Sequence, residues 1–196
     1  MEDLIILGLD IHVLEVVDII KQAGKHRFIG LVADNDDCPG EYLGLPVLGG
    51  PGVLADHSEA RRVPMHVWKD RNDKDNWVSI IASSAFVSSS ATIGKGCIIY
   101  PGCFIGANAR FGEGIFMLSG SIINHDCIIE NDVTITAGVR LAGSVTVRSG
   151  AYLGQACNIK QYLEIGKNST VGMGAVVTRN VPDNVTVVGC PARVKE

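Results

Sequence analysis

The sequence predicts two folds in one chain, a small α/β domain followed by a coil of short, stacked strands. The first observation is an apolar residue that recurs every six positions through the second half of the 196 residues. The second is a first half in which apolar runs alternate with a segment of helical spacing, a pattern typical of a parallel α/β domain. A hydrophobic content of 46% supplies enough apolar side chains for both cores.

The period-six repeat begins at Val87 and reaches Val177 without a slip. Its members are Val87, Ile93, Ile99, Ile105, Phe111, Met117, Ile123, Ile129, Ile135, Leu141, Val147, Leu153, Ile159, Ile165, Val171 and Val177. A second series of mostly small residues, from Ala85 to Ala175, stands two positions before each member. Helical faces recur near 3.6 residues and strand faces every two, so neither produces this period. The repeat predicts one strand and one tight corner per six residues, with three strands closing each coil.

Glycines and cysteines fit such a coil. Six glycines directly follow an inward residue and predict corners where a side chain would crowd or where positive φ is needed; they are Gly94, Gly106, Gly112, Gly154, Gly166 and Gly172. Four of the six cysteines occupy the small slots, where a free thiol packs as a compact apolar group. No CxxC spacing favours a zinc or redox site, so we expect reduced thiols.

The first half predicts a strand, a helix that ends at Gly24, and further strands. The expected strands are Leu4–Leu7, Phe28–Ala33, 44–48 and 63–68, with helices at 13–20 and at about 52–60. We place the α/β domain at 1–69, a charged linker and the first coil strand at 70–84, and the coil with its C-terminal tail at 85–196.

Composition excludes several classes of function. The formal charge of −4 comes without a basic run, so we expect no nucleic-acid partner. The acidic N-terminus is unlike a secretory signal, and no apolar run approaches the roughly 20 residues that cross a bilayer. We therefore expect a cytoplasmic protein without a membrane partner.

The repeat resembles that of the hexapeptide-repeat acyltransferases, whose coil is a left-handed parallel β-helix. The segment from Val188 to Arg193 is similar to the closing G-x-P-A-[KR] motif of that class. A Rossmann-like α/β domain before the coil resembles the sugar O- and N-acetyltransferases that modify bacterial sialic acids and nucleotide amino sugars. The resemblance implies acetyl-CoA as co-substrate, no metal, and a sugar as acceptor.

One histidine, His125, lies inside the repeat, in an N-H-D-C motif two positions after the inward Ile123. Its register points it outward near a corner, and a neutral imidazole can remove a proton from an amine or hydroxyl. The resemblance implies that His125 is the general base and that Asp126 orients it. It also makes the N–H of Gly143, eighteen residues later, the donor to the oxyanion.

The resemblance also implies where the substrates bind. The expected acetyl-CoA contacts are Gly143, Gly154, Gln155, Met173, Gly174, Ala175, Gly189 and Pro191. The expected acceptor contacts are Gly8, His12, Asp34, Asp36 and Asn124. Within the loop after the first strand, Leu9, Asp10 and Ile11 depart from the glycine-rich phosphate-binding pattern, and Thr134 stands where the family often has a second histidine.

Phe86, Phe104 and Ile122 precede inward residues at intervals of eighteen, so they stack into an apolar ridge. Such a strip usually marks an interface, and threefold closure would place active sites between subunits. The sequence therefore predicts a homotrimer. Two alternatives stay open, an O-acetyltransferase for a small hydroxyl acceptor such as serine, and a non-catalytic β-helix scaffold. The sequence names neither the acceptor nor the acylated atom, nitrogen or oxygen.

Overall fold

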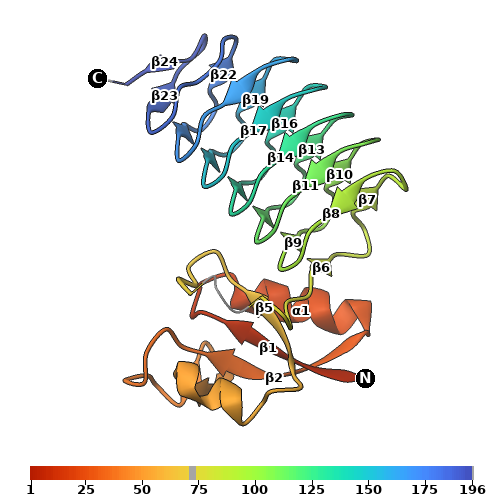
Figure 1. The fold of residues 1–196 in the computed structure, drawn as a ribbon, viewed down its shortest axis with the longest axis vertical. Helices are drawn as coiled ribbons and strands as arrows, with labels where there is room; N and C mark the ends of the chain where they lie inside the picture. Colours follow the sequence, from red (N-terminus) through yellow and green to blue (C-terminus); the bar gives the residue numbers. More distant parts are fainter. Residues whose placement is uncertain (71–73, 196) are drawn as a thin grey trace. The chain divides into compact units, whose positions relative to one another are not determined.

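The computed structural model describes residues 1–70 and 74–195, and the chain divides into two compact units (Figure 1). One unit comprises Met1–Ser83 with Lys95–Ile98, and the other comprises Ser84–Gly94 with the chain from Ile99 onward. Part of the expected linker, residues 71–73, lies outside the described residues.

The first unit is built on a five-stranded sheet with the order β3-β4-β2-β1-β5. Its elements are β1 (Glu2–Leu7), α1 (Val13–Ala23), β2 (His26–Val32), β3 (Glu41–Tyr42), β4 (Leu45–Gly49), the 3-10 helix η1 (Pro51–Ala55) and β5 (Arg61–Pro64). Strand β1 pairs in parallel with β2 and β5, and β2 pairs in parallel with β4. The apolar run Leu4–Leu7 is buried, and α1 ends at Gly24 in the left-handed conformation. The predicted parallel α/β architecture is confirmed.

Two local expectations for this unit were wrong, and one short strand was not predicted. Strand β3 forms an unexpected antiparallel hairpin with β4, because Leu43 and Gly44 both adopt positive φ in a two-residue turn. The short helix expected at 52–60 is a 3-10 helix that ends at Ala55. The strand expected at 63–68 is β5, which ends at Pro64, and the chain then turns where the Trp68 N–H donates to the Met65 carbonyl.

The second unit is a parallel β-helix with three faces. The first face contains β7 (Phe86–Val87), β10 (Phe104–Ile105), β13 (Ile122–Ile123), β16 (Arg140–Leu141), β19 (Asn158–Ile159) and β22 (Val176–Val177). The second face contains β8 (Thr92–Ile93), β11 (Arg110–Phe111), β14 (Ile128–Ile129), β17 (Thr146–Val147) and β20 (Glu164–Ile165). The third face contains β12 (Phe116–Met117), β15 (Thr134–Ile135), β18 (Tyr152–Leu153), β21 (Thr170–Val171), β23 (Thr186–Val188) and β24 (Arg193–Val194). Two earlier strands, β6 (Ile80–Ile81) and β9 (Ile98–Ile99), are hydrogen-bonded into the same sheet.

Successive strands of a face pair in parallel with partners eighteen residues apart up to β22, as in the pair of Ile105 with Ile123. Inward residues from Ile99 to Val177 are all buried, which confirms the period-six prediction. Cys97, Cys103, Cys127 and Cys157 are buried, free thiols, as expected from their slots. Burial raises the pKa of the Cys157 thiol to about 12.

Close approach of neighbouring coils explains the corner glycines. A Cβ on Gly154 would lie 2.6 Å from the backbone N of Met173, and one on Gly106 would lie 2.8 Å from the backbone N of His125. The positive φ values fall at other glycines, such as Gly120 and Gly138. Crowding, rather than positive φ, therefore selects glycine directly after the inward residue.

None of the helices in the described part of the chain combines the length and the apolar character needed to span a bilayer.

Candidate active site

His125 lies in the turn between β13 and β14, one of the stacked turns that join the first face to the second and that we name the first corner. Inward Ile123 is fully buried, so the chain two residues later points outward, and the His125 side chain is 61% exposed. Asp126 has a φ of +59°, and Asn108 and Ser144, one coil on either side, have the same left-handed conformation. The first corner thus holds His125 and Asp126 in a repeating backbone frame.

The His125 ring is oriented by the carboxylate beside it. Its Nδ1 lies 2.7 Å from Oδ2 of Asp126, and Oδ1 of Asp126 accepts a hydrogen bond of 3.1 Å from the Asn108 amide. The hydrogen bond from His125, and then the one from Asn108, lower the pKa of Asp126 below its ordinary value. Because Asp126 is ionised at neutral pH, Nδ1 of His125 carries the proton, and Nε2 keeps its lone pair available as a base.

Gly143 lies against the imidazole. A Cβ at this position would be 2.5 Å from both Cε1 and Nε2 of His125, so only glycine leaves room for the ring. Across the described residues, the Gly143 N–H donates to no acceptor. The Ser144 N–H donates to the His125 carbonyl at 2.9 Å, which ties the two coils together. The structure therefore brings the predicted trio of His125, Asp126 and Gly143 together.

Asn124 has a positioning role in this structure. Its side-chain amide donates to the Leu141 carbonyl at 2.7 Å, and its backbone N–H donates to the same carbonyl at 3.2 Å. The amide nitrogen of Asn124, an expected acceptor contact, thus holds the turn of His125 to the next coil.

Two further residues of the first corner, Asn108 and Ser90, were missed from the sequence. Asn108 supports Asp126 through its side chain, and its own N–H donates to the Ser90 hydroxyl at 3.0 Å. Residues 90, 108 and 126 are eighteen apart, so reading the corner positions coil by coil would have found this polar ladder.

A groove of about 420 Å³ opens beside Asp126. Its lining comes from two columns, the first corner and the adjacent outward positions of the second face: Ser90, Thr92, Asn108, Arg110, Asp126 and Ile128. Hydroxyl, amide, guanidinium and carboxylate groups in one groove suit a polar acceptor that presents many hydroxyl groups.

The other expected acetyl-CoA contacts lie on a different corner from His125. Gly154 and Gln155 follow β18, residues 173–175 follow β21, and Gly189 and Pro191 follow β23. Their turns stack on one another, since the Gly174 N–H donates to the Gln155 carbonyl at 2.8 Å. Gly154, Gln155 and residues 173–175 belong to the turns that join the third face to the first, which we name the third corner. Gly189 and Pro191 lie in the turn between β23 and β24, next to the third corner, where the Gly189 carbonyl accepts the Val176 N–H at 3.0 Å. Thr134 lies in β15 of the third face.

In the α/β unit, Gly8 and His12 flank the start of α1, as expected. Gly8 has a φ of +97° and donates its N–H to Val32. Asp10 between them is only 6% exposed; its Oδ1 accepts the His12 N–H at 2.7 Å, and its Oδ2 lies 3.5 Å from Nδ1 of His66. A carboxylate of this chain therefore occupies the helix N-terminus, where an external phosphate would otherwise bind.

Asp34 and Asp36 are exposed in the turn that follows β2. Because β1 and β2 are parallel, this turn and the Gly8 loop lie at the same edge of the sheet. Asp36 lies against Gly50, the residue after β4. The two aspartates thus share an edge of the sheet with Gly8 and His12.

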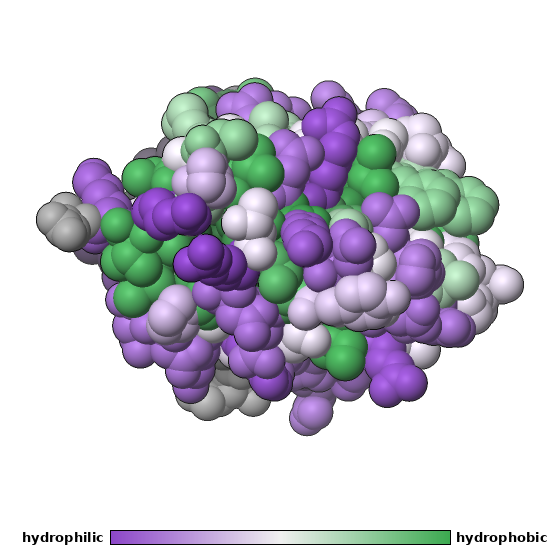
Figure 2. All heavy atoms as spheres, turned by 90° about the horizontal axis from the view of Figure 1, so that it is seen from above, coloured by the Kyte–Doolittle hydropathy of each residue, from purple (hydrophilic) through white to green (hydrophobic). Residues whose placement is uncertain are grey.

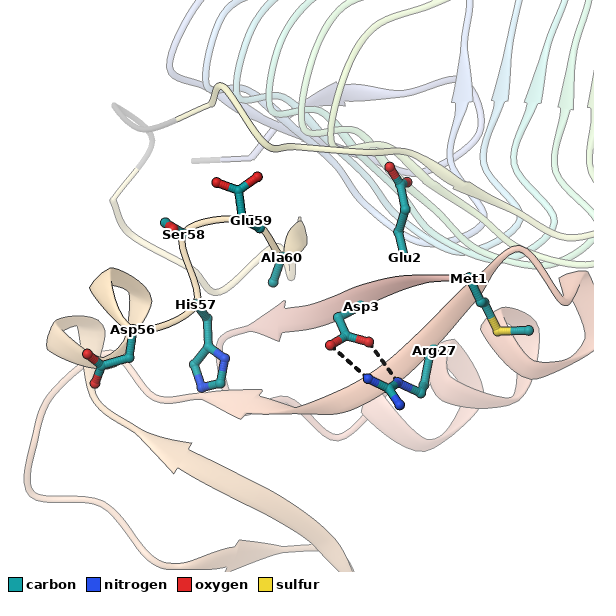
Figure 3. Close-up of a pocket in the computed structure, with 9 residues that line it drawn as sticks. All are labelled: Met1, Glu2, Asp3, Arg27, Asp56, His57, Ser58, Glu59 and Ala60. Carbon is teal, nitrogen blue, oxygen red and sulfur yellow. Dashed lines mark hydrogen bonds and ion pairs between the residues drawn. The ribbon is translucent and has the colours of Figure 1, made fainter.

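A separate hollow of about 470 Å³ lies elsewhere in the α/β unit. Figure 3 shows the Arg27 guanidinium joined to Asp3 by two hydrogen bonds, with Glu2 pointing to the opposite side of β1. Glu2 pairs with Arg61 at 2.8 Å. The charges of Glu2, Asp3 and Arg27 in this hollow are thus paired within the chain.

No group of three or more His, Cys, Asp or Glu side chains within residues 1–70 and 74–195 could hold a metal ion.

Solved structures with the same arrangement cover the whole chain. A histidine-to-alanine mutant of GDP-perosamine N-acetyltransferase from Caulobacter crescentus, in complex with CoA and GDP-perosamine, is 26% identical with a TM-score of 0.90; it is matched over 98% of its length and 100% of this chain. WeeI from Acinetobacter baumannii AYE is 27% identical with a TM-score of 0.84, over 100% of both chains. The acetyltransferase domain of PglB from Neisseria gonorrhoeae FA1090, at 22% identity and a TM-score of 0.85 over 100% of both chains, shares the fold.

Curated relatives match a short part of the coil sequence. Serine acetyltransferase of Buchnera aphidicola is 40% identical over 45 residues, which are 23% of this chain and 16% of the relative. Galactoside O-acetyltransferase of Lactococcus lactis is 43% identical over 44 residues, 22% of this chain and 21% of the relative. The chain therefore spans about a fifth or less of the curated relatives' length. No family model matches it.

Together the comparisons confirm the predicted class. The chain has the N-terminal α/β unit and left-handed β-helix found in the sugar acetyltransferases, and it is similar to acetyltransferases of the hexapeptide-repeat kind. Solved neighbours hold CoA or acetyl-CoA, in agreement with the expected co-substrate.

Proposed function

We propose that this protein transfers acetyl from acetyl-CoA to an amine or hydroxyl of a sugar or nucleotide-sugar acceptor. The observation that carries the proposal is the His125 ring, oriented by Asp126 at 2.7 Å and packed against Gly143. The fold shared with the GDP-perosamine N-acetyltransferase supports it.

In the proposed reaction, Nε2 of His125 takes the proton from the acceptor amine or hydroxyl as that group attacks the thioester carbonyl. The carbonyl π electrons move to oxygen, and the N–H of Gly143 donates to the oxyanion. Collapse of the tetrahedral intermediate re-forms the carbonyl, breaks the carbon–sulfur bond and releases CoA, whose sulfur takes the proton back from Nε2. Asp126 stabilises the imidazolium between these steps.

Acetyl-CoA would contact Gly143 at its thioester end and the third corner along its pantetheine arm. The third corner suits an extended ligand, because Met173 is 79% exposed and a Cβ on Gly174 would meet no atom within 4 Å. Since the third corner differs from the corner of His125, a neighbouring subunit would supply it.

We propose a homotrimer for this reason and because of the apolar ridge on the first face. Phe86 is 56% and Phe104 38% exposed, and their rings stack with centroids 5.0 Å apart. Figure 2 shows apolar side chains reaching the surface between hydrophilic ones on the face drawn. Light scattering should give three times the 20.8 kDa mass of the chain; a mass of 20.8 kDa would contradict the shared site.

The loop that contains Asp10 disfavours nucleotide-linked acceptors. Because the Asp10 carboxylate lies just before α1 and accepts the His12 N–H, a nucleotide phosphate would meet a like charge there. UDP-sugars should therefore bind weakly or not at all, and calorimetry with a UDP-amino sugar tests this; micromolar affinity would contradict it.

The second candidate is O-acetylation of a small hydroxyl acceptor such as serine, which the short match to serine acetyltransferase favours. A non-catalytic scaffold is the third. Incubation with acetyl-CoA and a pooled library of amino sugars, nucleotide sugars, free sugars and serine, followed by mass spectrometry, separates the three. We expect an acetylated sugar with the wild type and none with His125→Ala. An acetylated serine would select the second candidate, and no product with any acceptor would support the scaffold.

A further inference from the structure

The groove beside Asp126 holds one arginine, Arg110, at its centre. Arg110 is an outward residue of β11, exposed, between Thr92 and Ile128 in the same column of the second face. It also lines a second hollow of about 350 Å³ on the other side of this column. The guanidinium therefore stands where two hollows of the second face meet.

No carboxylate of the described chain forms an ion pair with Arg110. Arg148, at the nearby turn between the second and third faces, shows the contrast, since Glu130 and Glu164 bind it at 2.7 and 2.9 Å. Arg148 is neutralised within the fold, whereas Arg110 forms no ion pair in the described chain and acts on Asp126 only through its nearby charge. Arginine is well suited to an anionic ligand because its planar guanidinium donates two parallel hydrogen bonds to a carboxylate or phosphate.

The direction along the coil assigns this ligand to the acceptor. Gly143, the proposed contact of the thioester, lies one coil after His125, whereas Arg110 lies in the coil before it. Asp126 lines the same groove as a negative charge, and Arg110 is among the groups that lower its pKa, so an acceptor anion would have to bind Arg110 away from Asp126. His125, the proposed base, would then lie between the thioester, which binds toward Gly143, and the acceptor, which binds toward Arg110.

We propose that Arg110 binds a carboxylate or phosphate group carried by the acceptor, so that the site selects acidic sugars over their neutral counterparts. This inference rests on the proposed function and adds the substrate class. Arg110 acts in binding and specificity, and the proton transfer stays with His125.

Matched sugar pairs test the proposal. D-galactose with D-galacturonate isolates a carboxylate, and D-glucosamine with D-glucosamine 6-phosphate isolates a phosphate. Binding is measured by calorimetry or saturation-transfer NMR, so the test does not depend on turnover. The wild type should bind at least one charged sugar about 10- to 100-fold more tightly than its neutral partner. Arg110→Gln should abolish the ratio, and Arg110→Lys should keep part of it.

Lys167→Gln is the matched control, because it removes one exposed positive charge from a corner outside the groove. It should leave the binding ratio as in the wild type. Equal ratios in the wild type and Arg110→Gln would overturn the proposal, as would a wild type without preference. A loss of CoA affinity in Arg110→Gln would also overturn it, because the anion would then belong to the cofactor. Failure of the proposed function shows separately, as absence of acetyl transfer in the library assay.

Discussion

In the described part of the chain, each unit holds an aspartate–histidine pair, and we propose a catalytic role for only one of them. In the α/β unit, Asp10 and His66 are 3.5 Å apart, with an aspartate side chain that is 5% exposed. In the β-helix, Asp126 and His125 are 2.7 Å apart, with an aspartate side chain that is 48% exposed. The two pairs therefore differ in setting, because the carboxylate is buried in the first and half exposed at an open corner in the second.

The difference lies in what each carboxylate and its surroundings do. Asp10 gives one oxygen to the His12 N–H and so stabilises the start of α1. Asp126 accepts from His125 and Asn108, and the far edge of the His125 ring lies against Gly143, whose N–H has no acceptor among the described residues. The proposed catalytic pair thus differs from the other pair in having a backbone donor beside the second ring nitrogen.

The largest expected effect separates the two histidines. His125→Ala should lower kcat by about 10²- to 10⁴-fold, because it removes the general base. His66→Ala, the control, should leave kcat unchanged. Steady-state rates of CoA release measure both, with circular dichroism to confirm that each variant is folded. Equal rates for His125→Ala and the wild type would remove the base from the mechanism.

Gly143→Ala should have the next largest effect. The new Cβ would lie 2.5 Å from Nε2 and push the ring aside, and a displacement of that size should cost about 10²-fold in kcat. Gly40→Ala is the matched control, because a Cβ there meets no atom within 4 Å. Rates of the two variants are compared under saturating acetyl-CoA. An active Gly143→Ala enzyme would show that the ring is not confined as described.

Asp10→Ala tests the structural pair. The partly buried His12 N–H loses its acceptor, so the free energy of unfolding should fall by about 1 kcal/mol. Urea unfolding followed by circular dichroism measures the change. The exposed Asp18→Ala on α1 serves as the comparison and should change the stability less. A variant as stable as the wild type would mean that the Asp10 carboxylate contributes nothing to the fold.

Asn108→Ala should give the smallest effect, a shift in one pKa. The Asn108 hydrogen bond helps to lower the pKa of Asp126, so its removal should raise that pKa toward the ordinary value. Because the carboxylate is ionised only above its pKa, its support for His125 should then be lost at a higher pH on acidification. Carbon-13 NMR of the Asp126 carboxyl measures the shift, and an unchanged or lower pKa would contradict the assigned hydrogen bond.

The sequence predicted the β-helix, and it predicted that His125, Asp126 and Gly143 lie together, because the period of six fixes which way each residue points. His125 and Gly143 are one coil apart, so the register alone places one above the other. The sequence did not predict roles for Asn108, Ser90 and Arg110. Their contacts involve neighbours eighteen or more residues away, which no local motif contains.

The N-terminal unit was predicted less well because its details depend on backbone conformations that the sequence does not announce. Leu43 adopts positive φ in the β3–β4 turn, although branched residues seldom do. Asp10 was expected to repel a phosphate, and the structure adds that it turns inward and accepts the His12 N–H just before α1. The burial of Asp10 could not be predicted, because the loop that contains it has no repeat to show which way each side chain points.

The positive φ shared by Asn108, Asp126, Ser144 and Tyr162 has an evolutionary consequence. Each coil presents the same backbone at the first corner, so new chemistry can arise there by substitution alone. Changes in chain length are restricted, however. One residue added between His125 and Gly143 would turn the following inward residues toward solvent and separate the base from its donor. Duplication of a whole eighteen-residue coil outside that interval would lengthen the stack and leave the reacting atoms in place.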